Sequence, residues 1–284
     1  MPYKFTLTAA IMIKASVLIF CGYMLMSCSS QSVGTTTPNP QTKAFSKLVW
    51  SDEFNYNGLP DDAKWNYETG YIRNKEMQYY TSKRPENARV ENGNLVITAL
   101  SDSLKSGANM YPVTSASLIT KGIQDWTYGR LEVRAKIPSS LGTWPAIWTL
   151  GSNISEVGWP MCGEIDILEH VGYMPDTVHF NVHTQKYNHA INTGKGTRIY
   201  RPGVQNDFHV YSVEWTKDKI DWFMDGAKVF TYANEGTGVD AWPFYQPQYL
   251  ILNLAIGGAW GGQRGVDLKS LPQSMLVDYV RVYQ

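Results

Sequence analysis

Residues 163–169 read GEIDILE and set three carboxylates among large apolar side chains. In a β-strand, residues two positions apart share a face, so Glu164 and Asp166 point one way while the isoleucines that follow them point into the core. Strict alternation would place Glu169 in the core as well, where an unpaired carboxylate is very costly. A one-residue β-bulge at 167–168 is therefore predicted, because it returns Glu169 to the face of the other two carboxylates.

The spacing of the two glutamates indicates a chemistry. With one residue absorbed by the bulge, their Cα atoms lie roughly 13 Å apart, and side chains leaning together bring the carboxylates to about 5–6 Å. That is close to the ~5–5.5 Å of a retaining glycosidase and short of the ~6.5–9.5 Å of an inverting one. Three carboxylates in one site cannot all ionise freely, so at least one pKa rises and supplies a proton donor. The alternative is a solvated acidic strand edge, which the apolar neighbours disfavour.

Several segments in a fixed order extend this motif into a family resemblance. The chain resembles glycoside hydrolase family 16 in its bulged, laminarinase-like form, whose motif reads E-x-D-x-x-E. The resemblance implies that Glu164 is the nucleophile, that Asp166 assists it, and that Glu169 is the acid/base. It also implies an all-β, concanavalin-like jelly-roll sandwich with an open substrate groove. The segments that carry it, besides the motif, are Leu48–Phe54, Glu76–Thr81, Tyr128–Ala135, Gly142–Trp148, Gly257–Trp260 and Val277–Tyr283.

Strand patterns from residue 47 onward independently indicate an all-β fold. Many short strands separated by turns are typical of a sandwich, and no long stretch shows a helical period. Asn92-Gly93 and Asp225-Gly226 fit two-residue hairpin turns, which need positive φ. The predicted strands are Ala88–Val90, Leu95–Ala99, Ser115–Thr120, Gly129–Ile137, Ala146–Leu150, Glu164–Glu169, Val178–Thr184, His209–Trp215, Ile220–Met224, Lys228–Tyr232, Leu250–Ala255 and Leu276–Tyr283.

Charge and composition limit the classes of ligand that the protein is expected to bind. The chain has 284 residues, a formal net charge of +0 and a pI near 7.0, so nothing favours nucleic acid or an acidic polymer held by bulk charge. Aromatic residues make up 13% of the chain, and flat aromatic faces stack on sugar rings. Since an aromatic-rich β core is the simpler explanation, the composition supports a sugar site only together with the carboxylates.

The first residues have the pattern of a targeting segment. Lys4 and Lys14 precede an apolar run at 15–26, which is too short to span a bilayer comfortably. The run ends in LMSC and resembles a bacterial lipoprotein signal in which Cys28 is lipidated. An ordinary signal peptide or an uncleaved anchor are the alternatives. We therefore expect an exported protein, lipid-anchored at the bacterial cell envelope or surface, with a signal peptide at 1–28, a flexible Ser/Thr/Pro linker at 29–46 and a family 16 catalytic domain at 47–284.

Three tryptophans are candidate sugar-binding residues. Trp144 and Trp148 are four positions apart, so on a strand they share a face that either lines a groove or packs in the core. Trp260 lies in a Gly-rich loop with little core to join, which favours a functional role. By position in the family, Asn74 and Gln78 are expected to donate hydrogen bonds to sugar hydroxyls.

The strand predicted after the motif presents a polar face. Strict alternation places His179, Asn181 and His183 opposite the apolar residues between them. Two histidines four apart on a strand lie about 13 Å from each other, so the pair cannot share one metal ion. The resemblance favours a position for His183 near the catalytic acid, and His170 is expected to point away from the groove.

The resemblance also implies a structural Ca²⁺ on the convex side. Asp278, with backbone carbonyls near Glu53 and Gly93, would supply oxygen ligands, which Ca²⁺ prefers. The chain departs from the family at Ser117, where many members carry arginine. This departure leaves the three carboxylates untouched and bears on the sugar contacts and the linkage preference.

Together these features predict a retaining endo-β-glucanase acting on β-1,3 or mixed β-1,3/1,4 glucans. No cofactor is expected in the chemistry, and the protein is expected to be a monomer. One alternative is a hydrolase of another polymer, such as agarose, carrageenan or xyloglucan, on the same fold. A transglycosylase with a sugar acceptor and a non-catalytic surface glycan-binding lipoprotein are the others.

Overall fold

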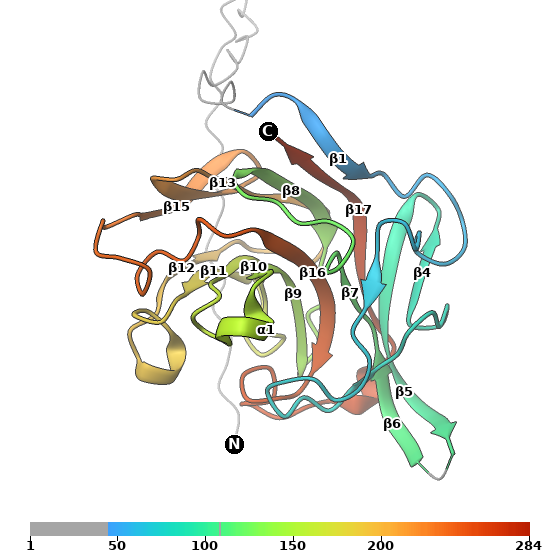
Figure 1. Cartoon of the computed structure of the whole chain (residues 1–284). Helices are drawn as coiled ribbons and strands as arrows, with labels where there is room; N and C mark the ends of the chain where they lie inside the picture. Colours follow the sequence, from blue (N-terminus) through green and yellow to red (C-terminus); the bar gives the residue numbers. More distant parts are fainter. Residues whose placement is uncertain (1–44, 108) are drawn as a thin grey trace, which may run out of the picture. The chain divides into compact units, whose positions relative to one another are not determined.

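Two β-sheets build the part of the chain that the structure, a computed structural model, describes: residues 45–107 and 109–284. The sheets stack on each other (Figure 1), and the predicted all-β jelly-roll sandwich is confirmed. Cys28, the signal peptide and nearly all of the linker lie outside the described residues. Among the described residues, no helix is long and apolar enough to cross a membrane.

The larger sheet, here the outer sheet, has ten strands in the described residues. Its main path runs β15-β14-β13-β8-β17-β5-β6-β3, with β1 paired to β17 and β4 paired to β5. These strands are β1 (Leu48–Asp52), β3 (Tyr79–Tyr80), β4 (Ala88–Glu91), β5 (Asn94–Ser106), β6 (Asn109–Ser115), β8 (Gly129–Lys136), β13 (His209–Trp215), β14 (Lys219–Met224), β15 (Ala227–Ala233) and β17 (Gln273–Tyr283).

The smaller sheet, here the inner sheet, has seven strands in the order β12-β11-β10-β9-β16-β7-β2. A four-residue helix, α1 (Ile154–Val157), and the 3-10 helices His189–Ile191 and Leu268–Ser270 lie in its connections. Its strands are β2 (Asn66–Tyr67), β7 (Ser117–Ile119), β9 (Thr143–Gly151), β10 (Glu164–Glu169), β11 (Thr177–His183), β12 (Lys195–Tyr200) and β16 (Gln248–Ile256).

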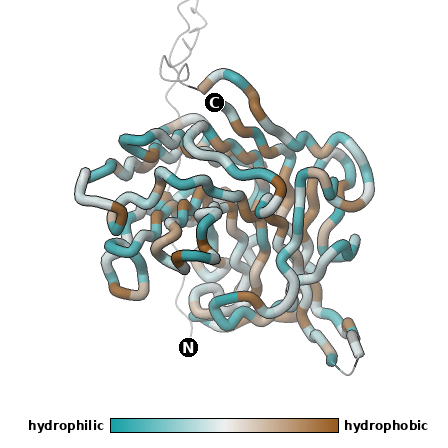
Figure 2. The backbone as a smooth tube through the Cα atoms, viewed as in Figure 1, coloured by the Kyte–Doolittle hydropathy of each residue, from teal (hydrophilic) through white to brown (hydrophobic). Residues whose placement is uncertain are grey.

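The main core fills the space between the sheets. Ile165 and Phe180 of the inner sheet and Val133 and Val280 of the outer sheet are fully or almost fully buried in one cluster. The alternation of apolar and polar residues along the strands is visible in Figure 2. One face of the inner sheet therefore belongs to the core, which leaves its other face for the polar side chains of β10 and β11.

The strand predicted at Ser115–Thr120 is wrong as a single element. The chain breaks at Ala116, because β6 pairs with β5 in the outer sheet while β7 pairs with β16 in the inner sheet. The segment is thus a crossover between the two layers. Both hairpin turns are confirmed, since Asn92, Gly93, Asp225 and Gly226 all have positive φ.

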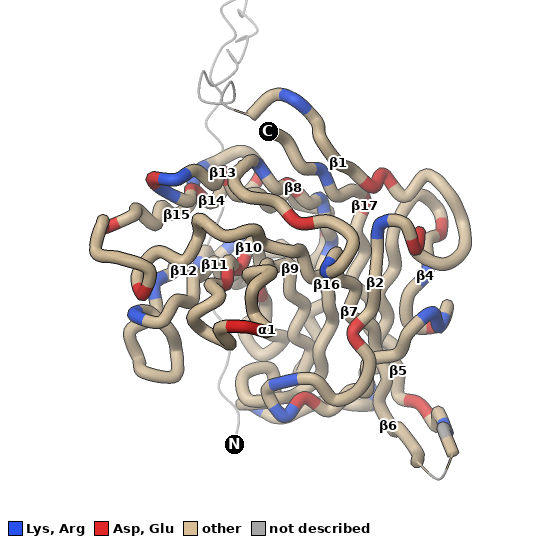
Figure 3. Tube along the Cα trace, in the orientation of Figure 1, with Lys and Arg blue, Asp and Glu red and all other residues tan. Residues whose placement is uncertain are grey.

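Charged side chains are interspersed over the described surface. Figure 3 shows lysine and arginine mixed with aspartate and glutamate along most strands and loops. Several are paired on the outer sheet, including Arg281 with Glu53 and Lys219 with Asp221. This mixed pattern agrees with the neutral net charge and with the expectation of an uncharged polymer.

Candidate active site

The predicted bulge is present in β10. The strand pairs Asp166 with Trp148 of β9, but Leu168 with the next residue, Ile147, so one residue of β10 is extra. Pairing with β11 shifts over the same interval. As a result Ile165, Ile167 and Leu168 are all buried in the core, and the three carboxylates all face one cavity on the opposite side.

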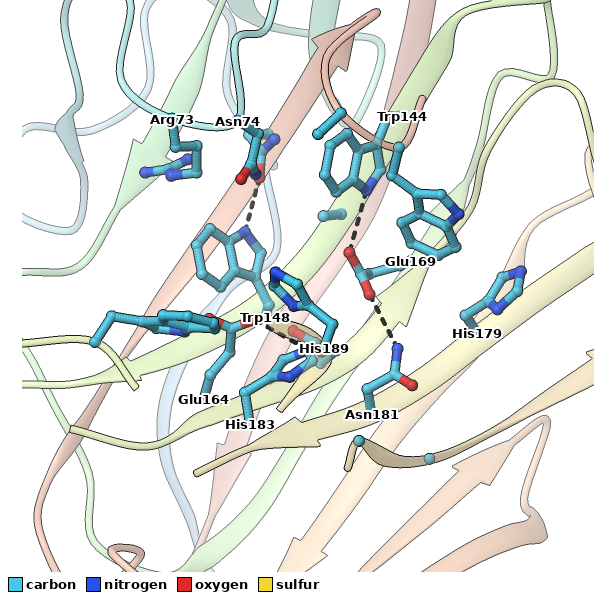
Figure 4. Close-up of a pocket in the computed structure, with 18 of the residues that line it drawn as sticks. Arg73, Asn74, Trp144, Trp148, Glu164, Glu169, His179, Asn181, His183 and His189 are labelled. Carbon is cyan, nitrogen blue, oxygen red and sulfur yellow. Dashed lines mark hydrogen bonds and ion pairs between the residues drawn. The ribbon is translucent and has the colours of Figure 1, made fainter. Parts of the chain in front are cut away.

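That cavity measures about 860 Å³ and is open to solvent along the inner sheet. Strands β9 to β12 and β16 form its floor, and loops at 73–76, 159 and 259–263 form its walls. Five of the predicted sugar-binding residues line the cavity: Asn74, Trp144, Trp148, His183 and Trp260. Figure 4 shows most of these side chains pointing toward one another across the cavity.

Glu169 is held by two neutral donors. Trp144 Nε1 donates to Oε1 at 3.1 Å, and Asn181 Nδ2 donates to Oε2 at 3.0 Å (Figure 4). Burial raises the pKa of Glu169 well above its usual range, and the nearby Asp166 and Glu164 raise it further. A carboxyl with a raised pKa stays protonated toward neutral pH, which is the state a proton donor needs.

Glu164 lies at the other end of the carboxylate row. Trp159 Nε1 donates to its Oε2 at 2.8 Å, so this indole fixes the orientation of the carboxylate. The Trp159 ring is 37% exposed and packs 5.2 Å from the His189 ring. Trp159 therefore forms part of the cavity wall and holds Glu164 in place.

Asp166 lies between the two glutamates and is 1% exposed. Its Oδ2 has no hydrogen-bond partner among the described residues and lies 3.4 Å from His183 Nε2. Burial raises the pKa of Asp166 well above its usual range, and the charge of Glu164 adds to this effect. The raised pKa favours the protonated form of Asp166.

His183 is not where the family resemblance placed it. Its Nε2 lies 3.6 Å from Glu164 Oε1 and close to Asp166, and in the strand register it pairs with Glu164. The residue opposite Glu169 is instead His179, whose pKa burial lowers to about 4. Antiparallel pairing explains the difference, because the first residue of β10 meets the last residue of β11.

One group of side chains in the described residues has the spacing of a metal site: Glu164, Asp166 and His183, whose ligand atoms lie within 4.8 Å of one another. The argument against a shared ion for His179 and His183 holds, since His179 is outside this group. His170 points away from the cavity as expected, because it is fully buried and its Nδ1 lies 2.7 Å from the Thr177 carbonyl oxygen.

The three tryptophans differ in their surroundings. Trp148 is 8% exposed, and its Nε1 donates to Asn253 Oδ1 at 2.7 Å. Trp144 and Trp260 meet edge to face with ring centroids 5.5 Å apart, next to Glu169. Trp148 is therefore a fixed part of the floor, while Trp144 and Trp260 form a corner beside Glu169.

Ser117, where many family members carry arginine, is linked to the cavity through Glu68 and Arg73. Ser117 Oγ donates to Glu68 Oε2 at 2.6 Å, and the other oxygen of Glu68 is paired with Arg73. The Arg73 guanidinium lies 4.9 Å from the centre of the Trp148 ring and lines the cavity. The loop residue Arg73 thus brings a positive charge to the region where many family members hold the arginine that this chain lacks at 117.

Gln78 does not reach the cavity and corrects the expectation that it contacts sugar. It is 1% exposed, donates to Glu76 Oε2 at 2.7 Å and accepts from the Ile256 amide at 2.7 Å. Asn74 does line the cavity and donates to Glu76 Oε1 at 3.2 Å. Gln78 therefore supports the wall that Asn74 and Glu76 form.

The residues predicted to hold Ca²⁺ lie on the outer sheet. Arg281 donates hydrogen bonds to both carboxylate oxygens of Glu53, at 3.0 and 2.7 Å. Arg134 donates to Asp278 Oδ2 at 2.7 Å. Gly93 lies in the turn between β4 and β5. The Glu53 carboxylate and one oxygen of Asp278 are therefore already paired with arginine, which leaves the other Asp278 oxygen as the side-chain donor for an ion.

Several cavity residues were absent from the sequence-based candidates, among them Arg73, Trp159, His189 and Asn253. Trp159 lies only a few residues before the motif, so its proximity was a usable signal. The other three come from distant loops and from β16, and only the folded arrangement brings them to the carboxylates.

Comparison with known proteins agrees with this geometry. The family model for glycosyl hydrolases family 16 matches residues 75–281. A beta-glucanase of Rhodothermus marinus is 50% identical over 247 residues, which cover 84% of this chain and 85% of the relative.

Solved structures with a similar fold and sequence are also glucanases. A variant of a non-specific endo-beta-1,3(4)-glucanase from this family, co-crystallized with 1,3-beta-D-cellotriosyl-glucose, has a TM-score of 0.81 at 50% identity and covers 85% of this chain and 95% of that chain. The laminarinase from Rhodothermus marinus has a TM-score of 0.80 at 50% identity, covering 84% of this chain and 97% of that chain. The chain belongs to glycoside hydrolase family 16.

Proposed function

We propose that this protein is a retaining endo-β-glucanase that cleaves β-1,3 bonds, alone or in mixed β-1,3/1,4 glucans. The observation that carries the proposal is the bulge in β10, which turns Glu164, Asp166 and Glu169 toward one cavity. The activities printed for the relatives, beta-glucanase and laminarinase, support glucan as the polymer.

The chemistry proceeds in two displacements. Glu164 attacks the anomeric carbon while Glu169 donates its proton to the glycosidic oxygen, so the C–O bond breaks and a glycosyl ester forms on Glu164. Water then attacks the same carbon, Glu169 takes its proton, and the ester bond to Glu164 breaks. Asp166 lies between the two glutamates, and its raised pKa favours the protonated form, which can donate a hydrogen bond to the Glu164 carboxylate when the ester bond breaks.

Substitution of the two glutamates tests these roles separately. Glu164→Ala and Glu169→Ala should each lower kcat on laminarin by on the order of 10³-fold or more. On an aryl β-laminarioside, whose leaving group departs without protonation, azide added as a small external nucleophile should restore turnover and give products of opposite anomeric configuration with the two variants. It would give an α-glycosyl azide with Glu164→Ala, where it replaces the nucleophile, and a β-glycosyl azide with Glu169→Ala, where it attacks the glycosyl ester.

The substrate assignment is tested on a panel of laminarin, barley mixed-linkage glucan, cellulose, agarose, carrageenan and xyloglucan. Release of oligosaccharides from laminarin or from the barley glucan supports the proposal, and release from agarose alone would replace the polymer. Binding to a polymer without release from any of them would favour a surface glycan-binding protein. Products longer than the substrate would indicate transfer to a sugar acceptor.

Three further features belong to the proposal. A lipid anchor on Cys28, with export to the cell envelope, rests on the LMSC sequence and is tested by metabolic labelling with a fatty acid in wild type and Cys28→Ser. Structural Ca²⁺ rests on Asp278 and on the backbone carbonyls near Glu53 and Gly93 that the family resemblance implies. A chelator should lower the Tm if the ion is bound. A monomer is expected from sedimentation.

A further inference from the structure

A loop at residues 70–80 connects the cavity wall to a separate aromatic surface. Gly70 and Tyr80 close the loop with two mutual backbone hydrogen bonds of 3.0 Å. Arg73, Asn74 and Glu76, in the middle of the loop, line the cavity. Since the loop is held both at its base and at the cavity, the side chains between these points have fixed places beside the cavity.

Three tyrosines gather at the base of this loop and on β6. Tyr79 and Tyr111 have ring centroids 3.9 Å apart, and Tyr71 lies 5.6 Å from Tyr79 and 6.1 Å from Tyr111. Strand pairing supports the arrangement, because β3, which contains Tyr79, runs parallel to β6. We call Tyr71, Tyr79 and Tyr111 the tyrosine cluster.

The tyrosine cluster is outside both hydrophobic cores and is partly open to water. Tyr71 is 57% exposed, and Ile72, which follows it in the chain, is 40% exposed. An exposed group of this kind marks a binding surface more often than scattered single residues do. The β5–β6 hairpin that carries Tyr111 extends beyond the body of the sandwich in Figure 1, so the surface is reachable by a long ligand.

The chemistry of the cluster fits a neutral sugar chain. Aromatic rings with hydroxyl groups offer an apolar face to a sugar ring and a hydrogen-bonding edge to its hydroxyls. None of Tyr71, Ile72, Tyr79 and Tyr111 carries a charge, which disfavours an acidic polymer. Tyrosines already packed against one another also lose little rotamer freedom when a ligand binds.

We propose that the tyrosine cluster is a distal binding surface for the part of a β-glucan chain that leaves the cavity past Arg73 and Asn74. This inference rests on the proposed function, because the occupant is the same polymer. Continuity through one closed loop selects that occupant, since Tyr71 is two residues from Arg73 in the chain and therefore within ~7 Å of it between Cα atoms.

The test compares a long and a short substrate. The double variant Tyr71→Ser/Tyr111→Ser is measured for kcat/KM on laminarin and on a short laminari-oligosaccharide that fits within the cavity. The ratio of the two values should fall about three- to tenfold relative to wild type, because only the polymer reaches the cluster. Tyr245→Ser is the matched control, since Tyr245 is 50% exposed and lies outside both the cavity and the cluster.

Each other outcome overturns the proposal. An unchanged ratio, or an equal fall in the Tyr245→Ser control, would mean that the cluster does not bind the polymer. Parallel losses on both substrates would mean that the tyrosines act through the cavity wall. Loss of a wild-type dimer in sedimentation, with an unchanged ratio, would assign the surface to self-association. Wild-type inactivity on the short substrate and on every glucan would instead refute the proposed function, which separates the two failures.

Discussion

At the scale of single residues, the two hydrogen bonds to Glu169 and the burial of the site act in opposite directions. Burial raises the pKa of Glu169, whereas the indole N–H of Trp144 favours the charged form and lowers it. The acid strength of Glu169 is therefore adjustable by a neighbour that does not ionise.

Trp144→Phe should move the alkaline limb of the pH profile of kcat/KM to higher pH. Without the N–H donor the carboxylate form of Glu169 is less stable, its pKa rises, and the protonated acid persists further into alkaline solution. A hydrogen bond to a charged group contributes ~1.5 kcal/mol, so a shift of about one pH unit is expected. Trp148→Phe is the control, because its N–H goes to Asn253. A limb that stays in place, or moves equally in both variants, would contradict the assignment of Glu169.

Asp166→Asn should lower activity and raise thermal stability, with a pH dependence of known sign. The folded pKa of Asp166 is raised, so folding binds a proton, and the stability of wild type falls as pH increases from the unfolded value of 3.8 through the folded pKa. Asparagine does not titrate, so the gain in Tm should grow over that window. The Tm of the variant should therefore exceed that of wild type near neutral pH, and the difference should shrink toward pH 4. Thermal melts from pH 4 to 8 check it, and a Tm difference independent of pH would contradict it.

At the scale of elements, β12 pairs with β11 and so helps to position the Asn181 side chain that binds Glu169. Gly196 pairs with Asn181 of β11, and a Cβ at this position would lie 2.1 Å from Asn181 Oδ1 and 2.4 Å from the Phe180 carbonyl oxygen. Only glycine permits the close approach of the two strands that places the Asn181 amide on Glu169.

Gly196→Ala should therefore displace Asn181 and lower kcat/KM about tenfold, since Glu169 loses one of its two donors. Gly194→Ala is a matched control in the same cavity wall, because the nearest atom to its Cβ is 4.0 Å away. Rates and Tm are measured for both variants. Equal rates for the two would mean that the Asn181 contact does not matter for catalysis.

The elements also show what the sequence can and cannot predict. The motif strand was predictable together with its bulge, because three carboxylates and the apolar residues between them admit only one phase. Strand β12, with the sequence KGTRIY, was missed because its residues are mostly polar and partly exposed. The break at Ala116 was missed because a crossover between sheets leaves no local signal in TSASL, and the meeting of Arg73 with Trp148 depends on contacts that no local pattern contains.

At the scale of the whole domain, the first strand closes the fold. Strand β1 pairs with the end of β17, and the buried Asp52 that ends it accepts hydrogen bonds from Phe54 N, Tyr56 Oη and Trp65 Nε1. These bonds tie the entry of the domain to its core, and the first strand of the sheet begins at Leu48.

A chain of residues 47–284 should therefore keep the Tm of the full chain, while one of residues 55–284 should lose at least ~10 °C. The shorter chain exposes the edge of β17 and leaves the Trp65 indole without its acceptor, a loss of several times ~1 kcal/mol. Thermal unfolding of the two purified chains checks this. Equal Tm values would show that β1 is dispensable.

Lys47 and Gln284 exchange two backbone hydrogen bonds, at 3.2 and 2.9 Å, so the described domain comes close to being a ring. A short linker could join these two residues, and the chain could be opened instead at Gly236, in an exposed turn away from the carboxylates. Such a circular permutant would keep every strand pair while moving β16 and β17 from the end of the chain to its beginning. The last two strands of the present chain, β16 and β17, would then be made before β1, which separates the history of the chain from the architecture it reaches.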